Sequence, residues 1–228
     1  STCPVSLQWD FGDGMPFSNL QSPVHSFPSG GVYNVTLTVT IGACSNSITH
    51  TVHAIDESPD FSSTATSGCK PAFSTFTATN ISSSNVANYY WDFGDGTTSN
   101  TTLGAINQIY HNSGTYTVTL IITDINGCKD TVTKTNYFRV NGPIANFSAI
   151  DTAGCIGLIT VFNDLSTNDG VNNIVNWEWD FGDGTVQTFN SPPFQHTYNI
   201  AGTYSVKLKV TDAAGCTDSL IRANQIIA

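Results

Sequence analysis

Apolar and polar residues alternate in three stretches of the chain. In residues 33–40 one set of alternate positions is apolar and the other polar, and residues 116–122, apart from Ile121, and 204–210 repeat the pattern. The apolar sets are Tyr33, Val35, Leu37 and Val39, then Tyr116, Val118, Leu120 and Ile122, then Tyr204, Val206, Leu208 and Val210. Because successive side chains of a strand point to opposite faces, each stretch predicts a strand that buries one face.

The sequence Trp-Asp-Phe-Gly-Asp-Gly precedes each of these stretches, at residues 9–14, 91–96 and 179–184. Its tryptophan and phenylalanine share one face of a strand, so we expect the aspartate between them to point outward. The Gly-Asp-Gly that follows predicts a turn. The copies lie 82 and 88 residues apart, a spacing that is too long for a solenoid repeat and typical of a small domain.

Further alternating stretches at residues 73–80, 131–140, 158–164 and 219–227 also predict strands, and no segment has the pattern of an amphipathic helix. Short strands separated by turn signals predict an all-β chain of tandem antiparallel β-sandwiches.

Short joints that contain proline, at residues 56–59 and 141–143, divide the chain into three modules, 1–56, 57–142 and 143–228. Such joints limit hinge motion compared with a Gly/Ser linker. Only eight residues precede Trp9, whereas more than twenty residues of module precede the tryptophan in the other two modules. We therefore expect the first module to lack its opening strands, which either lie upstream in a longer protein or come from elsewhere.

Composition narrows the classes of function. The 228 residues include 7 Lys plus Arg against 17 Asp plus Glu, a formal net charge of −10. A nucleic-acid binder needs a cationic surface, so nucleic acid is not an expected partner. No apolar run reaches the roughly 20 residues that span a bilayer. Hydrophobic residues make up 39% of the chain, enough for packed cores.

The repeated motif, the step His196-Thr-Tyr198 and the stretch Gly-Thr-Tyr-x-Val-x-Leu resemble the PKD (polycystic kidney disease) domain family over almost the whole chain. The resemblance implies immunoglobulin-like sandwiches of about seven strands per complete module. It also implies extracellular spacer, adhesion or interaction modules, which occur in tandem in bacterial surface adhesins and beside catalytic domains of secreted proteases and polysaccharide hydrolases. Phe27 departs from the pattern, because it stands where Tyr110 and Tyr198 stand.

Six cysteines fall two per module and are candidates for disulfides in an oxidising compartment: Cys3 and Cys44, Cys69 and Cys128, Cys155 and Cys216. The absence of Cys-x-x-Cys leaves a zinc or redox motif unsupported.

The pairing of these cysteines stays open. In an immunoglobulin-like order, the turns that hold Cys69 and Cys128 lie at opposite ends of one sandwich, whereas a bridge needs Cα atoms within about 7 Å. Either the first strand is arranged differently, or bridges cross the joints, for example from Cys69 to Cys216. Cys3 and Cys44 would lie at the same end of the first module and could pair directly.

No catalytic constellation is present. Asp-Phe-Gly occurs three times, but a Gly-rich phosphate loop, a strand lysine and a His-Arg-Asp catalytic loop are all missing. His25 and His196 are equivalent positions, and Gln108 in the second module preserves hydrogen bonding while losing metal or base function. We therefore expect no enzyme activity and no required cofactor.

His50 aligns with Lys134 and Arg222, at a position that we expect to be solvated.

The aspartates of the repeated motif are candidate calcium ligands: Asp10 and Asp13, Asp92 and Asp95, Asp180 and Asp183. They supply hard oxygen ligands near a turn, and backbone carbonyls could complete the calcium shell. The same residues have a structural use, because the first can cap nearby amides and the second favours a tight turn. The spacing is not that of an EF-hand, and we favour the structural use over calcium.

Thr131, Thr152 and Ser219 are candidate O-glycosylation sites. Asp130-Thr-Val132, Asp151-Thr-Ala153 and Asp218-Ser-Leu220 resemble the Asp-Ser/Thr-aliphatic sites of a bacterial periplasmic glycosylation system. Two of the three are equivalent positions, so the fold alone also explains them.

We expect a non-catalytic run of modules from a secreted or cell-surface bacterial protein, acting as a stiff spacer and adhesion segment. Its expected partners are other surface proteins or glycans and neighbouring modules of the same protein, through Thr/Asn-rich faces and edge strands. Two alternatives stay open. One is an accessory segment that presents substrate to a secreted protease or polysaccharide hydrolase; the other is an assembly subunit completed by a donated strand.

Overall fold

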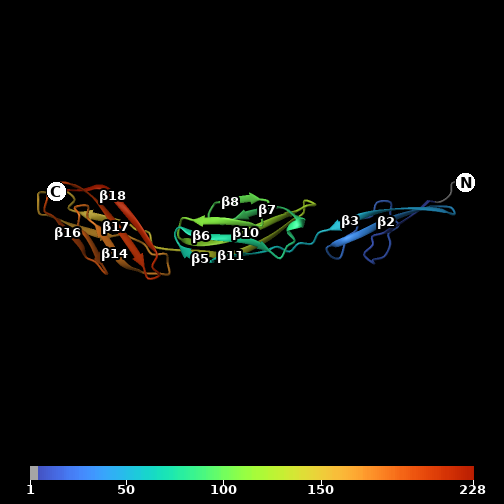
Figure 1. Ribbon diagram of the computed structural model, residues 1–228, viewed down its shortest axis with the longest axis horizontal. Coiled ribbons are helices and arrows are strands. Elements are labelled where there is room, and N and C mark those ends of the chain that lie inside the picture. The colour runs from blue at the N-terminus through green and yellow to red at the C-terminus, as the bar shows by residue number, and fades with distance from the viewer. Residues whose placement is uncertain (1–4) are drawn as a thin grey trace.

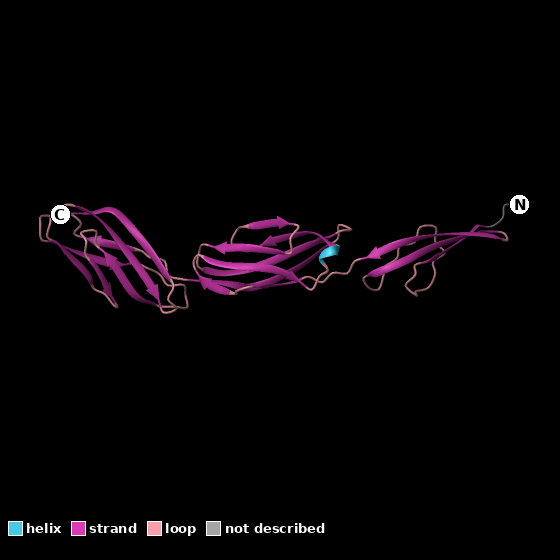
Figure 2. Ribbon diagram, in the orientation of Figure 1, coloured by secondary structure: helices cyan, strands magenta, loops and turns pink. Residues whose placement is uncertain are grey.

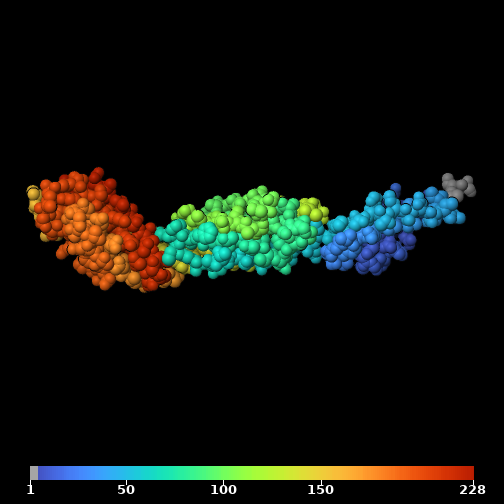
Figure 3. Space-filling view, viewed as in Figure 1, coloured from blue at the N-terminus to red at the C-terminus, as the bar shows by residue number. Residues whose placement is uncertain are grey.

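The computed structural model describes residues 5–228 and shows three β-rich modules in single file along one long axis (Figure 1). Nearly every element is a strand, and the helical part of the described residues is a 3₁₀ turn at Ser83–Asn85 (Figure 2). The first module lies at one end and the C-terminus at the other, so the molecule is far longer than it is wide (Figure 3). The prediction of an all-β tandem chain is confirmed.

The second module is a sandwich of two sheets, in the orders β4-β6-β9 and β5-β11-β10-β7-β8. Its strands are β4 (Asp60–Ser63), β5 (Ser67–Cys69), β6 (Ala72–Thr79), β7 (Val86–Asp92), β8 (Thr98–Thr101), β9 (Ala105–Tyr110), β10 (Gly114–Asp124) and β11 (Lys129–Asn141). All neighbours are antiparallel except β5, which pairs in parallel with the end of β11. This is an immunoglobulin-like arrangement with eight strands rather than seven.

The third module repeats the sandwich with sheets in the orders β12-β13-β16 and β15-β14-β17-β18. Its strands are β12 (Phe147–Ile150), β13 (Leu158–Asp164), β14 (Ile174–Asp180), β15 (Val186–Phe189), β16 (Phe194–Tyr198), β17 (Thr203–Asp212) and β18 (Thr217–Ile227). A parallel bridge between Ala153 and Ile227 reproduces the contact that β5 makes with β11. This module therefore has the expected seven strands.

The alternating apolar positions form the cores of these two sandwiches. Val118 and Leu120 of β10 are fully buried, as are Val206 and Leu208 of β17. The motif tryptophans, Trp91 and Trp179, are also 0% exposed. Burial of such side chains contributes roughly 1.5–3 kcal/mol each to stability. The period-2 pattern therefore reported the buried face correctly.

The first module has one sheet in the described residues, in the order β1-β2-β3. Its strands are β1 (Val5–Asp10), β2 (Gly31–Ile41) and β3 (Cys44–Ala54). Val35, Leu37 and Val39 of β2 are only half-buried, although their equivalents in β10 and β17 are fully covered. The difference arises because in residues 5–54 no second sheet faces β2.

Lys134 and Arg222 correct the expectation of a solvated position. Lys134 Nζ on β11 donates to the Phe61 carbonyl at 2.6 Å, lies 2.8 Å from Asp60 Oδ1, and sits over the Phe61 ring. Arg222 on β18 likewise donates from Nε to the Phe147 carbonyl at 3.0 Å. Each cation thus ties the last strand of its module to the first strand of the opposite sheet. Alignment with His50 misled the sequence reading, because β4 has no counterpart in residues 5–54.

Candidate functional site

Each Gly-Asp-Gly turn is built by its own aspartates. Oδ1 of Asp92 accepts a hydrogen bond from the Gly94 amide at 2.9 Å, and Oδ1 of Asp95 accepts one from the Thr97 amide at 2.9 Å. The other modules repeat both contacts through Asp10, Asp13, Asp180 and Asp183. Gly94 is required here, because its φ is +76° and an added Cβ would collide with the Thr117 carbonyl oxygen.

The second aspartate of each turn also contacts a histidine or glutamine side chain that lies 12 or 13 residues later in the chain. Oδ2 of Asp13 lies 2.7 Å from His25 Nε2, Oδ2 of Asp183 lies 2.7 Å from His196 Nε2, and Oδ2 of Asp95 accepts from Gln108 Nε2 at 2.7 Å. Burial would raise the pKa of Asp183, but hydrogen bonds from His196 and the Thr185 amide outweigh it and lower that pKa. The hydrogen-bonding interpretation of the His/Gln position fits this geometry.

These contacts bear directly on the calcium hypothesis. Both oxygens of Asp95 are engaged by protein donors, and in residues 5–228 no group of three or more His, Cys, Asp or Glu side chains is placed to hold a metal. The geometry is that of turn caps. Calcium binding by Asp10, Asp13, Asp92, Asp95, Asp180 and Asp183 stays a prediction.

The candidate glycosylation residues lie apart from one another. Thr131 and Ser219 are exposed on β11 and β18, at equivalent positions beside the hairpin tips. Thr152 is half-buried between β12 and β13, and its carbonyl accepts a hydrogen bond from Ile227. Modification at these sites stays a prediction.

The joint between the second and third modules is covalently closed. Cys69 at the end of β5 forms a disulfide with Cys216, at the tip of the β17–β18 hairpin, with Cα atoms 5.3 Å apart. Of the two arrangements left open by the sequence, the bridge that crosses a joint is therefore the one formed. The intramodule alternatives, Cys69 with Cys128 and Cys155 with Cys216, are wrong because the two cysteines of one module lie at its opposite ends.

The remaining cysteines have different surroundings. Cys44, Cys128 and Cys155 are exposed, and none of them is bonded to another described cysteine. The predicted pairing of Cys3 with Cys44 involves a residue outside the described range, so it stays a prediction.

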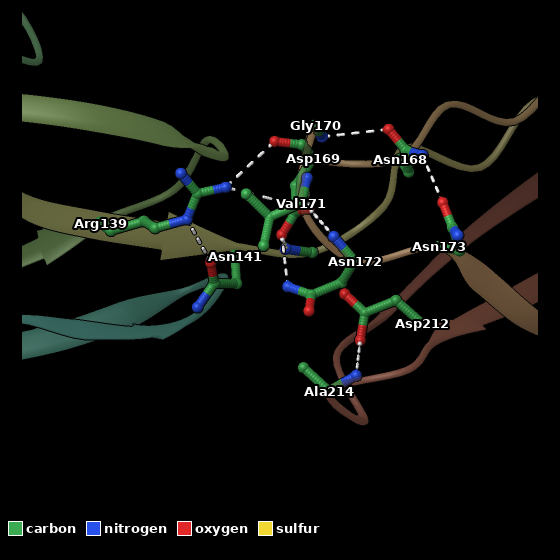
Figure 4. Close-up of polar contacts among 11 residues, drawn as sticks. Arg139, Asn141, Asn168, Asp169, Gly170, Val171, Asn172, Asn173, Asp212 and Ala214 are labelled. Atoms are coloured by element: carbon green, nitrogen blue, oxygen red, sulfur yellow. Dashed lines mark hydrogen bonds and ion pairs between the residues drawn. The ribbon is translucent and has the colours of Figure 1, made fainter.

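A buried carboxylate, Asp169, organises the polar side of this joint (Figure 4). Its side chain is 1% exposed, and its oxygens accept hydrogen bonds from the amides of Val171 at 2.9 Å, Asn172 at 2.7 Å and Gly142 at 3.2 Å. Gly142 belongs to the connection between the modules. Arg139, on β11 of the second module, donates from Nη2 to the Asp169 carbonyl at 3.2 Å.

Hydrogen bonding controls the ionisation of Asp169. Burial alone would raise its pKa, but the amides of Asn172, Val171 and Gly142 and the Asn172 side chain stabilise the charged form and lower the pKa to about 2. The carboxylate is therefore ionised at neutral pH and holds the loop 165–173 against the end of β11.

A second ion pair lies beside the disulfide. Lys70 Nζ is 3.2 Å from Asp218 Oδ2, and the same oxygen accepts a hydrogen bond from the Ala145 amide at 2.8 Å. Gly142 lies beside Lys70 and Cys216 with a φ of +134°, and a Cβ added to it would meet both residues at about van der Waals distance. The disulfide and the carboxylates of Asp169 and Asp218 thus fix one relative placement of the two modules.

The joint between the first and second modules is much less tied. One hydrogen bond between described residues crosses it, from Asn126 Nδ2 to the His53 carbonyl at 3.2 Å. Glu57, in the connection, instead binds the second module, accepting from the Ser82 amide at 2.9 Å and from Asn85 Nδ2 at 2.7 Å.

Sequence reasoning did not single out Lys70, Arg139, Asp169 or Asp218 as joint residues. Their partners are far away in the chain, and only the stacking of modules brings them together. One signal was available for Asp218, because it lies two residues after a cysteine expected to form a bridge.

Known proteins contain domains that are similar in sequence to all three modules of this chain. The model of the PKD domain family matches residues 1–54, 57–140 and 141–227. A microbial collagenase of Vibrio alginolyticus is 39% identical over 67 residues, which are 29% of this chain and 8% of that protein. The pre-pro-metalloprotease PrtV of Vibrio cholerae is 39% identical over 61 residues, 27% of this chain and 6% of that protein.

A solved structure of a single domain is also similar to part of this chain. The PKD1 domain of the Vibrio cholerae metalloprotease PrtV is 32% identical and covers 38% of this chain and 99% of that domain, with a TM-score of 0.32. The chain thus spans less than a tenth of the length of the curated relatives that it matches.

Proposed function

The chain belongs to the PKD domain family, a non-catalytic type of module, and on this premise we propose that it is a stiff extracellular spacer that also presents an interaction surface. The observation that carries the proposal is the closed joint between the second and third modules. A disulfide, a lysine–aspartate pair and a buried carboxylate all cross it. Contacts of this number restrict bending far more than a flexible linker does.

The disulfide also supports an extracellular location. Structural disulfides persist in oxidising compartments and are rare in reducing ones. No helix in the described residues is long and apolar enough to cross a membrane.

Small-angle X-ray scattering of the chain tests the spacer role. We expect the native protein to scatter as an extended particle, and we expect Cys69→Ser, or reduction, to add bent conformations that shorten the radius of gyration. Cys155→Ser is the matched control, because it removes an exposed cysteine that forms no bridge. A native particle that is already bent or compact would overturn the proposal, as would a curve that the loss of the disulfide leaves unchanged.

The interaction surface has a specific candidate on the second module. Asn88, Tyr90, Asn100 and Lys129 line a shallow hollow on the outer face of its larger sheet. An aromatic ring beside amide and amino groups suits a polar ligand such as a glycan. We expect Tyr90→Ala to weaken retention of the chain on a glycan array more than Thr133→Ala, a change on the same sheet outside the hollow; equal retention would count against this surface.

A second candidate function is favoured by the relatives. The matched segments of a collagenase and a metalloprotease suggest that modules like these accompany proteolytic domains, where they would present substrate. Sedimentation with insoluble collagen tests this alternative, because an accessory module should bind the polymer without cleaving it. The reading frame around these residues separates the two functions: a catalytic domain favours the accessory role and further repeats favour the spacer.

A further inference from the structure

The two halves of the Cys69–Cys216 bridge occupy two distinct kinds of position. Cys69 ends a short strand that pairs in parallel with the end of β11, and we call this a strand cysteine. Cys216 lies at the tip of the last hairpin of its module, and we call this a hairpin cysteine. Cys155 is a second strand cysteine, since Ala153 pairs with Ile227 as Ser67 pairs with Arg139. Cys128 is a second hairpin cysteine.

The hairpin that holds Cys128 reproduces the hairpin that holds Cys216. Oδ1 of Asp124 accepts hydrogen bonds from the amides of Asn126 at 2.9 Å and Cys128 at 2.8 Å. Oδ1 of Asp212 accepts the two equivalent bonds at the same distances. The bridged Cys216 is 2% exposed, whereas Cys128 is exposed and carries a free thiol. The local frame of a bridging cysteine is therefore already built at Cys128.

Cys128 faces the first joint. With Asp130, it lines a pocket whose other wall is the connection at Ile55, Asp56 and Glu57. Asp130 pairs with Ile122 as Asp218 pairs with Val210, so it is the equivalent of the aspartate that binds Lys70 at the second joint. Thiol and carboxylate thus stand side by side in the pocket, as they do where Cys69 and Lys70 dock.

The edge of β3 beside this pocket differs from the equivalent edges of the other modules. At the ends of β11 and β18, a short parallel segment pairs with the last strand. At the end of β3, around His53, residues 5–228 provide no such parallel segment, because β3 is the outer strand of the order β1-β2-β3. The contact made there by the next module is the hydrogen bond from Asn126 Nδ2 to the His53 carbonyl, which leaves the rest of this edge without a strand partner among the described residues. An open edge offers unpaired backbone groups to an added strand.

We propose that the first joint binds an extended strand of the form small-Gly-Cys-Lys, which pairs in parallel with the end of β3, forms a disulfide with Cys128 and places its lysine on Asp130. The template is Ser67-Gly68-Cys69-Lys70 at the second joint. This inference deepens the proposed spacer function, because it makes the loosely tied first joint a second stapled joint.

The covalent step needs a disulfide oxidant, such as oxidised glutathione. The Cys128 thiolate attacks one sulfur of glutathione disulfide, its S–S bond breaks, and one glutathione leaves as thiolate. The thiolate of the incoming cysteine then attacks the Cys128 sulfur of the mixed disulfide and displaces the second glutathione. Two cysteine thiols are oxidised, one glutathione disulfide is reduced, and the two protons pass to the two glutathiones.

A synthetic peptide with the sequence of residues 66–71, Thr-Ser-Gly-Cys-Lys-Pro, tests the site. The whole protein is incubated with the peptide in a glutathione redox buffer, and mass spectrometry measures the mixed disulfide at each cysteine. We expect about fivefold more peptide on Cys128 than on the strand cysteine Cys155, the factor that about 1 kcal/mol of main-chain hydrogen bonding supplies. Glutathione alone should modify Cys128 and Cys155 similarly. An equal yield of peptide on the two cysteines would overturn the proposal.

Two matched changes test the lysine contact. Asp130→Asn in the protein, or glutamate in place of lysine in the peptide, should lower the yield at Cys128 roughly twofold to fivefold, the range of an exposed ion pair. An unchanged yield in both would overturn the contact with Asp130. These measurements do not involve Cys69 or Cys216. If the peptide shows no preference for Cys128 but reduction changes the scattering curve, the spacer role stands and the strand site is excluded. If the peptide prefers Cys128 but reduction leaves the scattering curve unchanged, the spacer role alone is excluded.

Discussion

Gly94, which follows the motif phenylalanine, is required both for its positive φ and for the close approach of a neighbouring strand, and the two effects can be measured separately. Gly94 and Gly96 both have positive φ, +76° and +89°. A Cβ on Gly94 would collide with the backbone of Thr117, whereas a Cβ on Gly96 meets nothing within 4 Å. We expect Gly96→Ala to cost about 1–2 kcal/mol from backbone strain, and Gly94→Ala about 3 kcal/mol or more. Urea unfolding monitored by hydrogen exchange in β7 and β10 measures both, and equal costs would contradict the close approach.

Asp169 gives the second joint a definite response to acid. Its pKa lies at about 2, below its ordinary value of 3.8, so its stabilising contribution is fully present above pH 3.8 and is lost as pH falls through 2. The shift corresponds to about 2 kcal/mol. We expect the stability of the third module to fall by this amount between pH 4 and 2 in the native protein and by much less in Asp169→Asn.

The control for this titration is Asp151→Asn. Asp151 is exposed, and its contact with Thr160 is made by its backbone carbonyl rather than by its carboxylate. Its positive φ of +59° suits asparagine equally well. Its substitution should leave the acid limb of the stability curve unchanged. If Asp169→Asn titrates like the native protein, the buried carboxylate does not hold the joint.

For individual residues, the sequence predicted only contacts between near neighbours in the chain. The turn-capping roles of Asp92 and Asp95 could be predicted, because their partners lie two residues away. The role of Asp169 could not, because its partners Gly142 and Arg139 come from 27 and 30 residues earlier and meet it through module packing.

The clamp between the last strand and the first strand is a property of paired elements. Lys134 on β11 holds β4 through Asp60 and the Phe61 carbonyl. We expect Lys134→Ala to destabilise β4 by about 2 kcal/mol, since a hydrogen bond from a charged group is lost. Lys134→Arg should keep most of the stability, because Arg222 performs the same contact in the third module. Hydrogen exchange at Phe61 reports the opening of β4, and exchange that Lys134→Ala leaves unaltered would exclude the clamp.

Strand positions were predictable where alternation was strong. β13 has the predicted bounds, Leu158–Asp164, and β6 and β11 differ from the predictions by one or two residues at each end. β18 begins two residues before its predicted start and ends at the predicted residue. Short strands such as β5, β8 and β15 carry too few residues for a period-2 pattern to be visible. β5 matters most for the joint, since it delivers Cys69.

The two joints of the whole molecule should differ in accessibility. The chain has two glutamates, Glu57 in the first joint and Glu178 in the middle of β14, where it pairs with both neighbouring strands. We expect a glutamate-specific protease to cut after Glu57 at least about tenfold faster than after Glu178, since cleavage requires local opening. Electrophoresis of timed digests measures both rates. Comparable rates would show that the first joint is as closed as a sandwich core.

The disulfide at the second joint also changes how a pulling force applied at the two ends of the molecule is transmitted. Cys69 and Cys216 are 147 residues apart in sequence yet directly bonded. A pull applied at the two termini therefore passes through the sulfur atoms and bypasses the intervening polypeptide, even if the sandwiches there lose their shape. The bond shortens the greatest stretched length of the chain by roughly 500 Å, at about 3.4 Å per residue. Under mechanical load the disulfide would therefore limit how far the protein can extend, and its reduction would allow the polypeptide between the two cysteines to extend as well.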